Sequence, residues 1–213
     1  MMMMKTIKLA VIACATLAAC ASTPNSATLD QLAQQAIHSS FREQGIAKLD
    51  RLNQDAVQQA CSSEQPPSDA VAKRLEAEAQ ATIQWPKDGI YLGDWRVGEK
   101  LAQNGRGMTW NDKPGAPSGG NCYNCHQLTK AEISFGTIGP SLYHYGTARG
   151  VTDPLAPSAA PVLQYTWGKL WNSKASSACS AMPRFGHAGV LTQGQIRDLM
   201  ALLLDPKSPV NAQ

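Results

Sequence analysis

The feature that most restricts how this 213-residue chain can fold is the pentapeptide Cys-Tyr-Asn-Cys-His at residues 122–126. Two thiols three residues apart fit on one helical turn, where each can bond a vinyl group on the same edge of a porphyrin. The histidine that follows projects beneath the ring and can reach the iron. This spacing predicts covalent attachment of one haem c through Cys122 and Cys125, with His126 as an axial iron ligand.

Three other interpretations of the motif compete with haem attachment. A zinc site could use Cys122, Cys125, His126 and Cys179, but the second half of the chain lacks further ligands at zinc-like spacing. A thioredoxin-type redox pair needs a strand–helix–strand context, which the sequence does not show. A simple disulfide between the two cysteines would leave His126 without a role.

A sixth ligand to the iron is expected, because ligation by histidine and methionine suits electron transfer and raises the reduction potential. The methionines outside the leader are Met108, Met182 and Met200. Met200 lies on the apolar face of the last predicted helix, and Met108 lies in the loop before the motif. We predict Met182, because Pro183 stiffens its loop. His144 and His187 are rival ligands, each more simply explained as a surface or hydrogen-bonded histidine.

His126 also needs a hydrogen-bond acceptor for its second ring nitrogen. Such an acceptor determines the tautomer and the orientation of the imidazole. The backbone carbonyl of Pro140, in the stretch Thr-Ile-Gly-Pro-Ser-Leu, is the predicted partner.

The first twenty residues predict export. A short start with Lys5 and Lys8 leads into an apolar run that is typical of a secretory signal peptide and too short to span a bilayer as a mature helix. The end of the run, Leu17-Ala18-Ala19-Cys20, resembles a bacterial lipobox, although ordinary cleavage at the small residues is the alternative. We therefore expect a periplasmic protein that lipidated Cys20 would anchor to a membrane.

The charge of the chain excludes an electrostatic role in nucleic-acid binding. Beyond residue 20 the chain has 17 basic and 16 acidic residues, and the basic residues do not cluster. Binding to nucleic acid needs a clustered excess of Lys and Arg.

Hydrophobic spacing predicts helices and no strands, repeats or strand–helix alternation, so the expected fold class is all-α. Residues 21–30 are small and polar, as in a tether. An amphipathic helix is expected over residues 42–61, and a second helix capped by Ser68 must end before Pro86. Together these segments form an extension over residues 21–90.

The main domain is expected to occupy residues 91–213 and to contain three further helices. Asp94 can cap the first of them, and the second covers residues 161–172. Thr192 and Gln195 form a capping box at the start of the last helix, which has a broad apolar face.

These features together resemble a class I cytochrome c over residues 93–206. They are an early helix with a glycine, the Cys-x-x-Cys-His motif, a Gly-Pro-x-Leu stretch, Met-Pro, and a final amphipathic helix. In that family the first and last helices cross closely, which implies that Gly98 lies at the crossing, opposite Leu202. The resemblance implies a class I cytochrome c-like domain with an N-terminal helical extension.

Four segments are similar to the SoxX family, the subunits that pair with SoxA in SoxAX cytochromes of sulfur oxidation. They are GGNCYNCHQL, FGTIGPSLYHYG, SACSAMPRFGHAGVLT and LLLDPKSPVN. The part before residue 90 is similar to long forms of SoxX. The lipobox departs from the soluble periplasmic subunit that the family leads us to expect.

This resemblance implies a heterodimer with a SoxA-like haem subunit. The complex would oxidatively couple thiosulfate to a cysteine of the carrier SoxYZ, an L-cysteine S-thiosulfotransferase reaction. The bond-forming chemistry would lie on the partner, so this chain would contribute no catalytic residue and would pass electrons to a small cytochrome acceptor. The alternative is a free-standing periplasmic electron-shuttle cytochrome c, which the long extension disfavours. A ligand-sensing or peroxidase-like haem protein would require Met182 to leave the iron.

Cys61 and Cys179 remain once the leader cysteines, Cys14 and Cys20, and the motif are set aside. An exported protein enters an oxidising compartment, so we expect these two thiols to pair. The disulfide would tie the extension to the loop that carries Met182, three residues further on. Two separate thiols, buried or reactive, are the alternative.

Four other side chains have more than one expected role. Arg184 could pair with a haem propionate, face a partner or remain a solvated surface residue. The aromatic residues Tyr165, Trp167 and Trp171 could line the haem or fill the core, and we expect them in the core.

Overall fold

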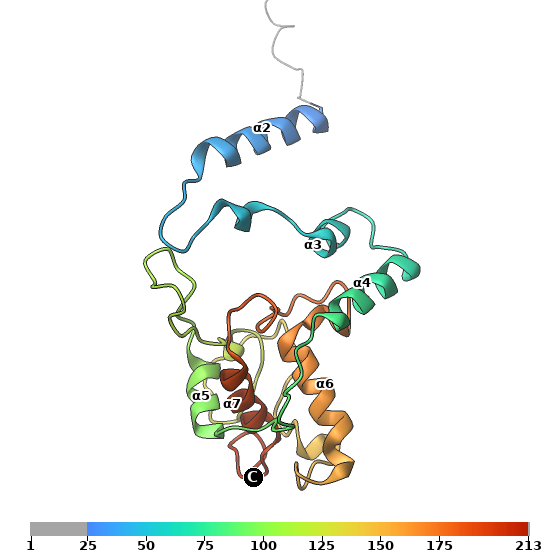
Figure 1. Ribbon diagram of the computed structural model, residues 1–213, viewed down its shortest axis with the longest axis vertical. Helices are drawn as coiled ribbons and strands as arrows, with labels where there is room; N and C mark the ends of the chain where they lie inside the picture. Colours follow the sequence, from blue (N-terminus) through green and yellow to red (C-terminus); the bar gives the residue numbers. More distant parts are fainter. Residues whose placement is uncertain (1–24, 213) are drawn as a thin grey trace, which may run out of the picture. The chain divides into compact units, whose positions relative to one another are not determined.

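The structure is a computed structural model that describes residues 25–212. The predicted signal peptide, with Cys14 and the predicted lipidation site Cys20, lies outside the described residues. Within residues 25–212 the regular structure is helical, apart from an isolated bridge between Gln44 and Ala47 (Figure 1). The prediction of an all-α fold is therefore confirmed for this part. The chain divides into two compact units, residues 1–42 and 43–213.

The first unit has one described helix, α2 (Ser26–Ser40), labelled in Figure 1. Its N-cap is Asn25, whose Oδ1 accepts a hydrogen bond from the backbone N–H of Thr28 at 2.9 Å. No side chain of α2 is buried. The prediction of a tether over residues 21–30 is wrong from residue 26 onwards, because a capped stretch rich in Ala, Leu and Gln favours a helix.

The single helix predicted over residues 42–61 is not formed. In its place the structure has a turn, the 3₁₀ helix η1 (Leu49–Leu52) and the short helix α3 (Ala56–Cys61). Gly45 has a φ of +50° and packs so closely on Trp110 that a Cβ would lie 2.0 Å from the Trp110 carbonyl oxygen. This left-handed turn interrupts the helix, although the hydrophobic spacing favours one.

The two later helices of the extension begin differently, because only α3 has a side-chain cap. Asp55 and Gln58 form a complete capping box at the start of α3. Helix α4 (Asp69–Ala81) begins after Ser68 as predicted, although the Ser68 side chain makes no capping hydrogen bond. It ends well before Pro86, so the last residues before the proline are not helical.

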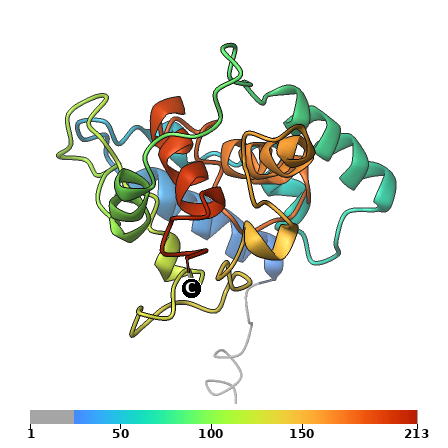
Figure 2. The same cartoon turned by 90° about the horizontal axis from the view of Figure 1, so that it is seen from below.

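The core of the second unit is formed by α5 (Trp95–Gln103), α6 (Ala160–Trp171) and α7 (Gln193–Leu204). Helix α7 packs against both α5 and α6, as Figures 1 and 2 show from two directions. The buried residues of α7 are Ile196, Leu199, Met200, Ala201, Leu202, Leu203 and Leu204. Seven of its twelve residues are thus buried, so packing of α7 contributes strongly to hydrophobic stabilisation.

The predicted caps of this core are present. Asp94 Oδ1 accepts the N–H of Arg96 at 2.8 Å at the start of α5. The capping box of Thr192 and Gln195 is complete at the start of α7. These caps satisfy backbone N–H groups that the first turn of a helix leaves free.

Helices α5 and α7 cross with almost no space between their backbones. A Cβ on Gly98 would lie 2.1 Å from the carbonyl oxygen of Asp198 and 3.1 Å from Cβ of Leu202. The expected contact of Gly98 with Leu202 is therefore confirmed. Beside it, the N–H of Asp94 donates to Asp198 Oδ1 at 2.8 Å.

Helix α6 joins the extension to the core. Trp167 and Trp171 are buried, and their indole N–H groups donate to the carbonyls of Gln84 at 3.0 Å and Thr82 at 3.1 Å. The prediction that they fill the core is confirmed. It is wrong for Tyr165, which is 50% exposed.

Short 3₁₀ helices fill the connections between the main helices. They are η2 (Cys122–Asn124), η3 (Thr147–Arg149), η4 (Pro157–Ala159) and η5 (Ser173–Ala175). Of these, η2 begins at the first cysteine of the predicted haem motif, and η5 leads from α6 towards Met182.

Candidate functional site

The Cys-x-x-Cys-His motif forms a tight turn at η2. The carbonyl of Cys122 accepts the N–H of Cys125 at 3.1 Å and the N–H of His126 at 2.9 Å. Both cysteines are free thiols of intermediate exposure. One turn of backbone therefore presents two thiols and an imidazole together, which is the arrangement that covalent haem attachment requires.

The imidazole of His126 is held on one side by a hydrogen bond. Its Nδ1 lies 2.7 Å from the carbonyl oxygen of Pro140, the partner named from the sequence. A carbonyl can only accept, so Nδ1 carries the proton and Nε2 keeps a free lone pair. The geometry leaves the nitrogen that could bind a metal available.

Gly139 forms a cradle for this ring, and sequence reasoning did not find it. A Cβ at Gly139 would lie 2.1 Å from Cε1 and 2.4 Å from Nδ1 of His126, so only glycine fits here. Its N–H donates to the carbonyl of Cys125 at 2.8 Å, which connects this segment to the motif. The only signal in the sequence was the Gly-Pro pair itself.

The thiol of Cys122 is poorly suited to redox chemistry of its own. Although Cys122 as a whole residue is partly exposed, burial of its thiol group raises the pKa of Cys122 to about 12. A thiol–disulfide enzyme needs a thiolate near neutral pH, which this environment opposes. The thioredoxin-type interpretation is therefore weakened on chemical grounds as well as by the all-helical context.

Met182 reaches the same hydrophobic core from a different loop. We call residues 178–187 the Met182 loop; it lies between η5 and α7. Met182 is partly buried and, like Cys122, packs against the main cluster of buried residues. Its backbone carbonyl accepts a hydrogen bond from Ser173 Oγ at 2.5 Å. The role of its sulfur as an iron ligand stays a prediction.

The other candidate ligands lie in different surroundings. Met200 is fully buried inside α7, as expected for a core residue, and Met108 is 37% exposed. His187 is exposed. His144 has a left-handed backbone with a φ of +57°, and its buried Nδ1 has no hydrogen-bond partner in the described part of the chain. Met200 therefore takes part in core packing, as predicted.

Cys61 and Cys179 form a disulfide bond, with an S–S distance of 2.00 Å and a Cα–Cα distance of 5.4 Å. Cys179 is therefore not available to the zinc site considered as an alternative. Across residues 25–212, no group of three or more His, Cys, Asp and Glu side chains is placed to hold a metal ion.

Arg184 has a partner that sequence reasoning missed. Its Nη1 lies 2.5 Å from Oδ2 of Asp55, and its side chain is 19% exposed. None of the three roles considered for Arg184 included this ion pair. Asp55 carried only the signal of a helix N-cap, which says nothing about a residue 129 positions away.

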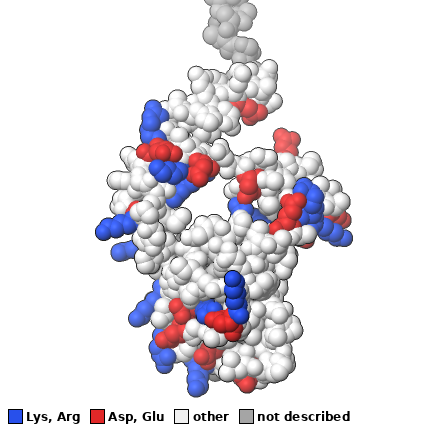
Figure 3. Space-filling model, in the orientation of Figure 1, with Lys and Arg blue, Asp and Glu red and all other residues white. Residues whose placement is uncertain are grey.

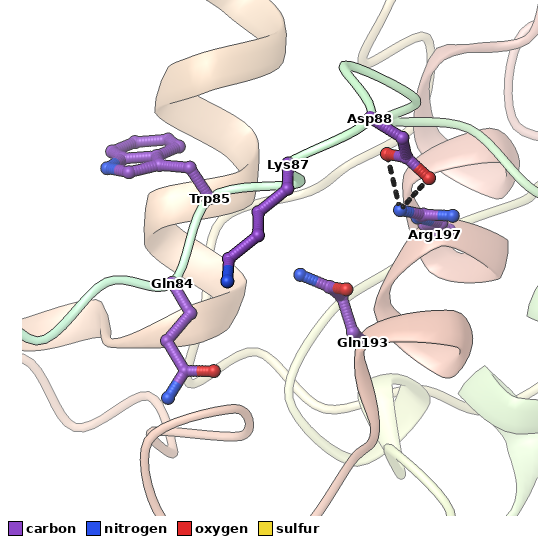
Figure 4. Close-up of a pocket in the computed structure, with 6 residues that line it drawn as sticks. All are labelled: Gln84, Trp85, Lys87, Asp88, Gln193 and Arg197. Atoms are coloured by element: carbon purple, nitrogen blue, oxygen red, sulfur yellow. Dashed lines mark hydrogen bonds and ion pairs between the residues drawn. The ribbon is translucent and has the colours of Figure 1, made fainter.

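A pocket elsewhere in the second unit does not belong to this site. It is lined by Gln84, Trp85, Lys87, Asp88, Gln193 and Arg197 (Figure 4). Arg197 Nη2 donates to both carboxylate oxygens of Asp88, at 2.7 and 2.8 Å, on one side of this pocket. No residue predicted to hold the haem lines it, so the pocket is not a candidate haem site.

Charges of the two signs are interspersed on the face shown in Figure 3. This face offers no extended patch of one sign that could steer an ionic partner. Among the described helices, none combines the length and the apolar character needed to cross a membrane.

Comparison with known proteins places the chain in a family. No protein-family model matches the sequence. The chain is 38% identical over 161 residues to an uncharacterized lipoprotein of Aquifex aeolicus (strain VF5), and the match covers 74% of this chain and 73% of that protein. The chain therefore belongs to the same family as this lipoprotein.

Proposed function

We propose that this protein is a lipid-anchored, mono-haem c-type cytochrome of the cell envelope that transfers electrons. The observation that carries the proposal is the turn at residues 122–126, where two free thiols and one imidazole are presented together. The donor set fits covalent haem, and the Gly139 cradle with the Pro140 carbonyl orients the imidazole. The domain over residues 91–213 would then be of the class I cytochrome c type.

Each residue of the site has a defined task in this proposal. When bound, the haem supplies a one-electron ferric–ferrous couple. Cys122 and Cys125 hold it covalently, and the Pro140 carbonyl keeps His126 in the tautomer with Nε2 free. The proposed thioether ligand of Met182 favours the ferrous state. With His126 and Met182 both bound, the iron would keep no open position for a substrate, so the chain would relay electrons and contribute no catalytic residue.

The finer proposal is that the chain is the electron-accepting subunit of a SoxAX-type, thiosulfate-oxidising complex. The segments MPRFGH and LLLDPKSPVN support it, because neither is a general feature of cytochromes c. A SoxA-like haem subunit would couple thiosulfate to a SoxYZ-like carrier. This chain would take the released electrons and pass them to a small cytochrome.

Anchoring through Cys20 is supported by the lipobox and by the relative that is named a lipoprotein. Two or more acyl chains would hold the protein stably on a membrane surface. Metabolic labelling with a tagged fatty acid should mark the wild type and Cys14→Ala but not Cys20→Ala. Labelling that persists in Cys20→Ala would remove the anchor from the proposal.

Covalent haem is tested by producing the full chain with its own leader in a bacterium that attaches haem c. The intact mass should exceed that of the protein by one haem, and the reduced pyridine adduct should show thioether-bonded haem. The variant Cys122→Ser/Cys125→Ser should lose the haem. The matched variant Cys61→Ser/Cys179→Ser should retain it. A wild type without covalent haem would refute the proposal.

The subunit role is tested by native purification from thiosulfate-grown cells of the host. A second haem protein recovered in equal amount is the expected result. A lone, stable monomer that is quickly reduced and reoxidised would instead support the free electron shuttle.

A further inference from the structure

Helix α3 (Ala56–Cys61) contributes no buried side chain to the core, yet both of its ends are bonded to the same loop. Its last residue, Cys61, is joined to Cys179 by the disulfide. Its N-cap residue, Asp55, pairs with Arg184 at 2.5 Å. Helix α3 therefore restrains the Met182 loop and adds no buried side chain to the core.

These two connections close a ring that contains Met182. One side of the ring is residues 55–61, and the other is residues 179–184 of the Met182 loop. The six helical residues separate the anchors by about 9 Å, at about 1.5 Å per residue. A six-residue segment held at both ends by a rigid helix keeps few of its conformations. Met182 lies inside this restricted segment.

The direction of the Asp55 carboxylate is set by the helix cap. One oxygen, Oδ1, accepts the N–H of Gln58 at 2.9 Å, and Gln58 Oε1 accepts the N–H of Asp55 at 2.9 Å. The other oxygen, Oδ2, is then directed at Arg184. Because the Arg184 side chain is only 19% exposed, the pair is less screened than an ordinary surface ion pair.

Two further hydrogen bonds hold the loop from other elements. Glu76 of α4 accepts the N–H of Ala178 through Oε1 at 3.0 Å. Ser173 of η5 donates its hydroxyl to the carbonyl of Met182 at 2.5 Å. The backbone is thus held immediately before the disulfide and at Met182 itself, and the Arg184 side chain is held two residues later.

We propose that Asp55 and α3 form a brace that positions Met182 on the haem iron, with Asp55 as a positioning residue. This inference rests on the proposed role of Met182 as an axial ligand. In this proposal the extension has a function, because it holds Met182, the weaker of the two proposed iron ligands, in place.

The two ends of the brace can be released separately. Asp55→Asn keeps a side-chain oxygen that can cap α3 but removes the charge that faces Arg184. Cys61→Ser/Cys179→Ser releases the other end. The matched control is Asp88→Asn, which breaks the ion pair with Arg197. In that pair the side chains are 47% and 23% exposed, against 42% and 19% in the brace, and Asp88 also accepts a backbone N–H.

Each brace variant, purified with haem bound, should bind carbon monoxide in the reduced state with an affinity about tenfold higher than that of wild type. A loss of about 1.4 kcal/mol of restraint on the loop would raise the population in which Met182 is not bound to the iron about tenfold. The ferric thioether-to-iron absorption band should weaken, and the reduction potential should fall. Amide hydrogen exchange in residues 179–184 should become about tenfold faster by the same relation. Asp88→Asn should match wild type in all of these measurements.

Met182→Ala distinguishes failure of the brace from failure of the proposed ligand. If its absorption and magnetic spectra equal those of wild type, Met182 is not a ligand, and both proposals are overturned. If Met182→Ala alters the spectra while the brace variants equal Asp88→Asn, only the brace is overturned. Faster exchange with unchanged spectra and carbon monoxide affinity would also overturn it, because α3 would then stabilise the loop without positioning the ligand.

Discussion

At the scale of single residues, a few polar groups hold their neighbours in defined orientations. The Pro140 carbonyl selects the tautomer of His126, and the Asp55 carboxylate serves both a helix cap and an ion pair. Asn211 is a third such residue, at the end of the chain. Its Oδ1 accepts the N–H of Gly146 at 2.9 Å, and its Nδ2 donates to the carbonyl of Leu203 at 3.0 Å.

Truncating Asn211 should therefore destabilise the fold. Asn211 is only 7% exposed, so Asn211→Ala leaves the N–H of Gly146 and the carbonyl of Leu203 buried without this partner. Leaving buried polar groups unpaired costs about 1–3 kcal/mol. Urea unfolding should show a loss in the free energy of unfolding of that size. Asn53→Ala, at an exposed position, should change the free energy of unfolding little. An equal loss in Asn211→Ala and Asn53→Ala would contradict the explanation.

Stability at acid pH should depend on Asp55. Partial burial alone would raise the pKa of this carboxyl, but hydrogen bonds from the Gln58 N–H and Arg184 outweigh burial and lower the pKa overall. The folded state thus favours the carboxylate. The resulting stabilisation is present above the ordinary pKa of about 3.9 and is lost as the pH falls through the lower pKa of the folded state.

Unfolding measured between about pH 5 and pH 3 checks this dependence, since that range spans the ordinary carboxyl pKa. Wild type should lose more stability on acidification than Asp55→Asn, which cannot titrate at this position. Asp50→Asn, an exposed residue of the same extension, should behave like wild type. Parallel pH profiles of wild type and Asp55→Asn would show that the ion pair contributes nothing to acid sensitivity.

At the scale of secondary-structure elements, the crossing of α5 and α7 determines the core. Their backbones approach closely at Gly98, and the N–H groups of Gly93 and Asp94 bond to residues of α7 beside it. Helix α7 then carries the largest share of buried side chains. The Cys-x-x-Cys-His motif follows α5 in the sequence and begins at η2, which packs against α5.

Gly98→Ala should weaken this crossing although alanine favours helices. Replacing a helical glycine with alanine gains about 1 kcal/mol in propensity. Here the new Cβ would lie 2.1 Å from a backbone oxygen of α7, which no side-chain rotation relieves. Overpacking costs about 1–3 kcal/mol, so the net effect should be a loss of stability.

Gly194→Ala provides the matched comparison in the first turn of α7. The atom nearest to a new Cβ at Gly194 would lie 4.0 Å away, so the gain in helix propensity should appear without a clash. Thermal or urea unfolding should show opposite signs for the two variants. A stabilising Gly98→Ala would mean that the helices separate at little energetic cost.

At the scale of the whole second unit, one covalent bond ties the extension to the core. The disulfide joins residues 118 positions apart, so it closes a long loop in the unfolded chain. Closing such a loop typically stabilises a protein by about 2–4 kcal/mol, mainly by restricting the unfolded state. Hydrogen bonds from Trp167 and Trp171 to the extension add non-covalent contacts between the same parts.

The variant Cys61→Ser/Cys179→Ser should lose about 2–4 kcal/mol of stability in urea unfolding. Adding dithiothreitol should lower the free energy of unfolding of wild type towards that of the variant. The free energy of unfolding of the variant itself should not change. Thiol titration of unfolded, unreduced wild type should find neither Cys61 nor Cys179. Two reactive thiols that map to these positions would contradict the disulfide.

Features that depend on residues close together in the chain could be predicted from the sequence. Capping residues Asp94, Thr192 and Gln195 act within one helical turn, so their helices begin where predicted. The turn of the Cys-x-x-Cys-His motif is equally local, and the apolar spacing of α7 repeats within the helix. The all-α class follows from these short-range patterns.

Features that depend on residues far apart in the chain could be seen only in the folded molecule. Trp110 lies against Gly45, at the turn that breaks the predicted helix of residues 42–61. Arg184 finds Asp55 across 129 positions, and Gly139 meets the His126 ring only because the backbone brings them together. Short-range propensity differs by about 1 kcal/mol per residue, and one packing contact can outweigh it. Such contacts therefore determine the boundaries and connections that local patterns leave open.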